Sequence, residues 1–316
     1  MKRLFPLIVL ICFNAYAQKY QAIDTKVKEY PSEVTAKELA KKVKKDFSSK
    51  ENQVRATFYW VANNIKYNLS EYYNPSRKRI GFSYTDEADK LRKLQAIKDS
   101  IVEQTLTTRQ AVCEGYAQTL SKIFTLLQLE NYVVKGYVRN SIRDINNEPL
   151  MPNHAWNVVK VNEEWMVLDA TWAAGSVING RWQVSFEDYY FNIPRRNYLK
   201  THYPAEKKWM LGQKLSKKSF YSQPIFTPEF LKTDLELINP LKGAIKFKKG
   251  KTITLEVKNL LSYQTVLCGL SGYRFAKQPN LVYKNGIGYI KITPTKDCDK
   301  LSLVVDGEIY IKYKLI

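Results

Sequence analysis

Residues 153–172 read NHAWNVVKVNEEWMVLDATW. β-Branched and aromatic residues, which favour strands, fill most of this stretch, and one polar pair, Asn162-Glu163, interrupts it. We therefore expect two strands, 154–161 and 165–171, joined by a two-residue turn. Such a pair predicts an antiparallel hairpin inside a mixed helix and strand domain.

The hairpin register places particular side chains together. If the turn holds two residues, Val161 faces Glu164 and Trp156 faces Asp169. His154 lies on the same face as Trp156, so it is one diagonal step from Asp169. Diagonal neighbours are ~7–8 Å apart at the backbone, which is within reach of long side chains. A carboxylate there can fix the tautomer of the imidazole and stabilise its charged form.

A cysteine precedes this hairpin at the start of a predicted helix. Residues 111–117 read AVCEGYA, and an apolar stripe from Cys113 to about Gln128 predicts the helix. Backbone N–H groups at a helix N-terminus stabilise an anion and so favour the thiolate of Cys113. Gly115 would leave space beside the sulfur. Taken alone, Cys113 could equally be a buried, inert thiol.

The order of these residues favours a catalytic interpretation. Only two histidines occur, His154 and His202, and His154 is the better general base for Cys113. Asp169 could by itself be a turn former, but a cysteine, a histidine and an aspartate together predict a nucleophile, a base and an orienting carboxylate. His202 stands in an aromatic segment beside Tyr203-Pro204, so we expect a structural role and consider catalysis the minor alternative.

These motifs resemble the transglutaminase-like superfamily, whose core residues are Cys, His and Asp in that order. The matching residues are Val112–Ala117, Asn153–Asn157, Leu168–Trp172 and the helix around Arg55–Tyr67. The stretch from Asp188 to Trp209, with Thr201-His202-Tyr203-Pro204, resembles the kyphoscoliosis-peptidase-like subgroup. Together they cover about residues 50–212. Ala111 departs from the glycine that many members carry before Val-Cys, which concerns the backbone at the nucleophile.

The resemblance implies a papain-like α+β core and acyl transfer through a thioester on Cys113. His154 would move the proton and Asp169 would orient His154. Water as acceptor makes a peptidase or deamidase, and an amine makes a crosslinking transglutaminase. The Cys113 N–H would donate to the oxyanion, with a second donor or groove residue among Gln53, Trp60, Trp156 and Trp172. The alternative is a catalytically silent module that keeps the fold and binds an envelope polymer.

No cofactor or metal is expected. Two histidines and four cysteines supply a zinc site poorly, and there is no acidic loop of the kind that binds Ca²⁺. The aromatic residues after the hairpin could line a substrate groove, but core packing is the expected use for most of them: Trp156, Trp172, Trp182, Tyr189, Tyr190 and Phe191.

The N-terminus is expected to direct export. In residues 1–17, a basic start precedes an apolar run of about ten residues, too short to span a bilayer, and Ala15-Tyr16-Ala17 fits signal peptidase. We expect cleavage after Ala17 and a periplasmic or extracellular protein; an uncleaved anchor is the alternative. The 316-residue chain carries +20, which favours an anionic polymer or membrane surface beside its peptide or protein substrate. Scattered basic residues and export argue against nucleic acid.

Beyond residue 225 only short strand-like runs with frequent turns follow, which predict a β-sandwich of the immunoglobulin-like kind. The predicted strands include 251–257, 263–268, 287–292 and 300–305. The expected organisation is a signal peptide (1–17), an N-terminal arm (18–50), the catalytic domain (51–212), a linker (213–240) and the sandwich (241–316). Within the sandwich, Cys268 and Cys298 are expected to form a disulfide that leaves Cys113 free.

Overall fold

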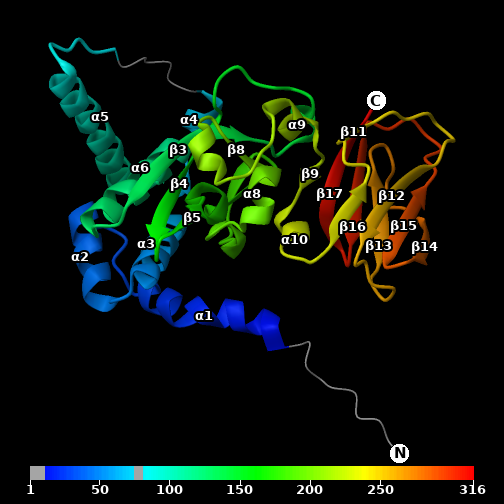
Figure 1. Cartoon of the computed structure of the whole chain (residues 1–316), viewed down its shortest axis with the longest axis horizontal. Coiled ribbons are helices and arrows are strands. Elements are labelled where there is room, and N and C mark those ends of the chain that lie inside the picture. Colours follow the sequence, from blue (N-terminus) through cyan, green and yellow to red (C-terminus); the bar gives the residue numbers. More distant parts are fainter. Residues whose placement is uncertain (1–10, 75–80) are drawn as a thin grey trace, which may run out of the picture. The chain divides into compact units, whose positions relative to one another are not determined.

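The computed structural model describes residues 11–74 and 81–316, with side chains from residue 19 onward. It is a mixed α+β structure (Figure 1). The chain divides into two compact units, one of residues up to Val134 with Ala155–Ile193, the other of Lys135–His154 with Pro194–Ile316. The start of the predicted targeting segment, residues 1–10, lies outside the described residues. Among the helices that are described, none is long and apolar enough to cross a membrane.

Helices make up most of the first unit. Their N-termini are set by local side chains: Thr35 forms a capping box with Glu38, and Ser49 accepts from the N–H of Asn52. The helices are α1 (Ile11–Lys28), α2 (Ala36–Asp46), α3 (Lys50–Asn64), α4 (Leu69–Tyr73), α5 (Glu87–Thr108), α6 (Cys113–Leu126) and α7 (Ala170–Ala174). The apolar stripe predicted after Cys113 is buried in α6, which contacts α2, α3 and α5.

The predicted N-terminal arm is in fact part of this packed unit. Tyr20 and Val27 of α1, and Leu39 and Val43 of α2, are all buried. The buried guanidinium of Arg55 in α3 makes two hydrogen bonds to Asp24, at 2.6 and 2.8 Å, and a third bond to Asp188. Because a buried charge needs these partners, the arm and the helical core are one structure.

The predicted hairpin is confirmed. Strands β4 (His154–Val161) and β5 (Glu164–Leu168) pair antiparallel with Val161 opposite Glu164. Asn162 and Glu163 both have positive φ, 49° and 64°, as a type I′ hairpin turn requires. The second strand ends before its predicted end at 171, because Asp169 is the N-cap of α7.

β4 and β5 continue into a sheet of four strands in the order β5-β4-β3-β8. β3 is Asn131–Val138, and β8 is the short strand His202–Pro204, which pairs with β3 through Val138↔His202. Two short strand pairs accompany the helices: β1 (Lys66–Tyr67) pairs parallel with β2 (Gln110–Ala111), and β6 (Gly175–Ile178) forms a hairpin with β7 (Arg181–Val184).

The second unit holds the strand-rich part that is coloured yellow to red in Figure 1. One sheet has the order β10-β12-β15-β14, and the other β11-β17-β16-β13, with β9 also paired to β17. Alternate residues of β12 and β13 are buried, as in a sheet with one face on a core. The strands are β9 (Ile225–Phe226), β10 (Glu236–Asn239), β11 (Ala244–Ile245), β12 (Ile253–Lys258), β13 (Val266–Leu270), β14 (Asn280–Lys284), β15 (Ile287–Ile292), β16 (Lys300–Val305) and β17 (Glu308–Leu315).

The stretch predicted as a linker, 213–240, is instead folded. It contains α9 (Lys217–Ser222), β9, α10 (Pro228–Leu231) and β10, following α8 (Arg195–Thr201). Phe220, Tyr221, Phe230 and Leu231 are buried there. These aromatic and aliphatic side chains belong to the core of the second unit, so the boundary at 241 is wrong.

The predicted disulfide is also wrong. Cys268 and Cys298 are both free thiols. Cys268 lies in the middle of β13 rather than at its end and is buried in the sandwich, opposite Leu303. Cys298 lies in the half-exposed turn before β16. Burial raises the pKa of the Cys268 thiol to about 12, so this residue serves as a small apolar core group.

Candidate active site

Cys113 is the first residue of α6, and it is half-exposed and free. The residue before it, Val112, is the N-cap and offers no side-chain acceptor to the first turn. The first N–H groups of α6 therefore lack a side-chain cap at the end where the helix dipole favours an anion. Cys113 thus lies at the start of a helix, as the sequence predicted.

Gly115 has a different purpose from the one expected. A Cβ on this glycine would lie 2.5 Å from the Cβ of Ala111 and 2.6 Å from the Oγ1 of Thr105. The absence of a side chain thus lets α6 approach β2 and α5. Close packing of the helix, rather than room beside the sulfur, explains this residue.

Tyr67 lies beside the start of α6, and sequence reasoning gave it no role. β1 holds it in register with Ala111, and the N–H of Asn68 donates to the Ala111 carbonyl at 2.9 Å. The ring packs against Trp182 of β7, with centroids 5.5 Å apart. Burial raises the pKa of Tyr67, and the electrostatic interaction with Cys113 raises it further, so the phenol keeps its proton. The motif Ile65-Lys66-Tyr67, which resembles the family's first core helix, was the sequence feature that could have pointed to Tyr67.

Asp169 occupies the point where β5 ends and α7 begins. It is fully buried, and its Oδ1 accepts from the N–H groups of Thr171 and Trp172 at 3.0 and 3.1 Å. Its own N–H donates to the carbonyl of Tyr190 at 3.0 Å. These bonds fix the carboxylate in one orientation. His154, the first residue of β4, is also buried, with 8% of its surface exposed.

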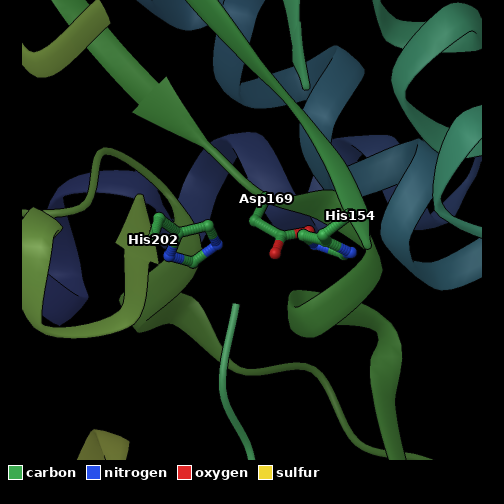
Figure 2. A group of neighbouring side chains, drawn as sticks. All are labelled: His154, Asp169 and His202. Carbon is green, nitrogen blue, oxygen red and sulfur yellow. The ribbon is translucent and has the colours of Figure 1, made fainter. Parts of the chain in front are cut away.

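His202 completes a group that the sequence did not predict. Ligand atoms of His154, Asp169 and His202 all lie within 4.8 Å of one another, and all three residues are buried. Figure 2 shows the Asp169 carboxylate between the two imidazole rings. Cys113 is not a member of this group. The sequence did not predict this proximity, because His202 is placed by the pairing of β8 with β3, and the two strands are more than sixty residues apart in the chain.

Two of the remaining candidates, Gln53 and Trp60, bond to backbone carbonyls of other segments. Gln53 donates its side-chain N–H to the Phe47 carbonyl at 2.8 Å, and Trp60 donates to the Pro31 carbonyl at 3.1 Å. Trp156 is 1% exposed and packs in the core. Trp172 is half-buried and lies edge-on to Tyr190. Core packing therefore accounts for Trp156, Tyr189, Tyr190 and Phe191, whereas Trp172 and Trp182 remain partly accessible.

The same three side chains could hold a metal ion. Two imidazole nitrogens and one carboxylate oxygen are donors that Zn²⁺ and related ions accept. An imidazole–carboxylate–imidazole arrangement is equally a hydrogen-bonding group, in which one carboxylate orients two rings. A free half-exposed thiol at a helix N-terminus, together with a buried histidine and aspartate, is typical of cysteine acyl-transfer chemistry.

Comparison with known proteins defines the class. Residues 34–182 match the family described as the transglutaminase-like domain, which supports the resemblance found in the sequence. The match begins within the predicted arm, which agrees with the packing of α2. Together with the buried His–Asp–His group, it supports a family of cysteine peptidases and acyltransferases.

Among curated proteins, the chain is similar to kyphoscoliosis peptidase. It is 24% identical to the Homo sapiens protein over 302 residues, which is 92% of this chain and 41% of that protein. Hillarin of Drosophila melanogaster is 20% identical over 149 residues, 42% of this chain and 18% of hillarin. The chain thus spans less than half the length of these relatives. A solved structure of a TGase covers 58% of this chain and 42% of its own at 19% identity and a TM-score of 0.31.

Proposed function

We propose that this protein is an exported cysteine acyl-transfer enzyme that acts on peptide or protein amides through a thioester on Cys113. The observation that carries the proposal is the buried pair of His154 and Asp169 at the open end of the β4–β5 hairpin. Burying an imidazole and a carboxylate costs desolvation free energy, so a buried pair of this kind points to a function. The free thiol at the start of α6 supplies the nucleophile.

In the proposed reaction, His154 takes the thiol proton and the Cys113 sulfur attacks the amide carbonyl. The C–N bond then breaks, and His154 returns the proton to the leaving amine. Asp169 fixes the ring of His154 and stabilises its charged form. The oxyanion that forms is held by the N–H of Cys113 and the hydroxyl of Tyr67, which burial keeps protonated.

The acyl acceptor decides the name of the activity. With water, the thioester is hydrolysed and the enzyme is a peptidase or deamidase; with an amine, it crosslinks. We favour hydrolysis because the relatives that match along most of this chain are named peptidases. A net charge of +20 suits work beside an anionic polymer or membrane surface of the envelope.

Mass spectrometry of a peptide mixture incubated with the protein, with and without added amine, tests this proposal. Wild type should give cleaved or deamidated peptides, and Cys113→Ala should give none. Cys298→Ala is the matched control because Cys298 is also a free, half-exposed thiol, and it should keep full activity. Equal product from wild type and Cys113→Ala would contradict the proposal.

A further inference from the structure

The second histidine of the chain lies against the first. The ring centroids of His154 and His202 are 5.9 Å apart. His202 opens β8 opposite Val138 of β3, and both the N–H and the carbonyl of Val138 bond to the side chain of Asn153, next to His154. The backbone of β3 therefore fixes the separation of the two imidazoles.

Several contacts fix the position of the His202 side chain. It is fully buried, its ring stacks on Tyr198, and its Nδ1 lies 2.8 Å from the hydroxyl of Thr201. The hydroxyl of Thr201 also lies 3.4 Å from the Tyr198 carbonyl, and the shorter contact with Nδ1 favours donation to the ring. The ring proton of His202 then resides on Nε2. Nε2 is then a donor, and Asp169 has a ligand atom within 4.8 Å of the ring nitrogen that faces it.

We propose that His202 is a positioning residue that binds the Asp169 carboxylate from the side opposite His154. This inference rests on the proposed function and deepens it. The backbone N–H groups of Thr171 and Trp172 fix one carboxylate oxygen, and His202 fixes the plane of the carboxylate by a further hydrogen bond. Asp169 can then meet His154 in one geometry only (Figure 2).

The test measures how fast iodoacetamide alkylates Cys113, read by mass spectrometry of the Cys113 peptide across pH 5–9. In wild type, a correctly oriented His154 should make Cys113 react readily with iodoacetamide at pH 6. We expect His202→Phe, which keeps an aromatic ring but no donor, to slow alkylation at pH 6 about tenfold. His202→Gln, which restores an N–H near the Nε2 position, should recover most of the rate.

A double-mutant cycle separates positioning from mere packing. If His202 acts through Asp169, then His202→Phe should have little further effect in an Asp169→Asn background. Additive losses, or an unchanged rate in His202→Phe that still folds by circular dichroism, would overturn the inference. If His202→Phe does not fold, the comparison of His202→Gln with His202→Leu decides it.

Two other outcomes are distinguishable. If wild-type Cys113 is alkylated like an ordinary thiol at every pH, the proposed function fails and the inference fails with it. If the effect of His202→Phe appears only with added ZnCl₂ and vanishes after dialysis against EDTA, the three residues form a metal site and positioning is overturned. If wild-type Cys113 reacts readily at pH 6 and the His202 variants do not change its rate, the proposed function stands and only the role of His202 is overturned.

Discussion

At the residue scale, Asp169 combines two functions in one carboxylate. Its Oδ1 caps α7 through two backbone N–H groups, and the same side chain lies beside His154. The helix cap needs an oxygen acceptor, whereas the imidazolium needs a negative charge. An amide can replace the carboxylate in the first function but not in the second.

Asp169→Asn should therefore separate stability from activity. We expect its free energy of unfolding to lie within about 1 kcal/mol of the wild-type value. Asp169→Ala should lose a further ~1 kcal/mol because it also removes the helix cap. Both should lower kcat by at least about tenfold, because the orientation of His154 is lost. Urea unfolding and steady-state kinetics on a cleaved peptide measure the two effects. Equal stability of the Asn and Ala variants would show that the cap is unimportant.

Tyr67 provides a test of the oxyanion site. Tyr67→Phe keeps the ring against Trp182 but removes the hydroxyl. We expect kcat to fall about 100-fold with little change in KM, since the hydrogen bond strengthens only as charge develops on the oxygen. Tyr72→Phe, a change on a neighbouring exposed ring, is the control and should be neutral. Full activity of Tyr67→Phe would assign the second donor elsewhere.

Cys268 should make stability depend on alkaline pH. Burial raises the pKa of its thiol from 9.0 to about 12, so between these values the folded chain holds a proton that the unfolded chain releases. This contribution to stability is complete below pH 9 and is lost as pH rises toward 12. Wild type should lose more stability than Cys268→Ala between pH 7 and pH 10, measured by urea unfolding. A parallel decline of both proteins would contradict this assignment.

At the element scale, the sequence predicted the elements whose formation depends on residues that are close together in the chain. The β4–β5 hairpin follows from a polar pair between two β-rich runs, and α6 follows from an apolar stripe. The position of His202 next to His154 was not predicted, because β8 is three residues long and its partner β3 is distant in sequence. The arm was misjudged because its lysines dominate its composition, while Leu39 and Val43 form the buried face.

Arg55 of α3 bonds to Asp24 of α1 and to Asp188, so its removal should lower the stability of the first unit. Arg55→Met leaves the half-buried Asp24 without a partner, and we expect the free energy of unfolding to fall by about 3 kcal/mol. The more exposed ion pair of Lys19 and Glu51 joins the same two helices. Lys19→Met is thus a matched control and should cost under about 1 kcal/mol. Urea unfolding of both variants makes the comparison, and similar losses would contradict a special role for Arg55.

At the scale of the whole molecule, the sequence predicted a sandwich at the C-terminus but placed its start too late. β9 and α10 contact β17, and β10 pairs with β12, although all three precede residue 241. Short elements of this kind carry little periodicity, so only the folded chain reveals them.

Two fragments test the boundary. A fragment of 224–316 keeps β9, α10 and β10, whereas one of 241–316 exposes the edges of both sheets and loses the buried Phe230 and Leu231. We expect the shorter fragment to be less stable by more than about 2 kcal/mol, from the apolar burial it lacks. Urea unfolding of the two fragments gives the difference. Equal midpoints would restore the later boundary.

The parallel pairing of β1 with β2 has a consequence for tolerance to insertion. It places Tyr67 opposite Ala111, so backbone hydrogen bonds hold together the two ends of the segment between them. Lengthening a segment with fixed ends adds only a small entropic cost of loop closure, because this cost grows with the logarithm of the segment length. Related chains can therefore carry very different segments here, and a reporter domain could be inserted, while Tyr67 and Cys113 keep their places.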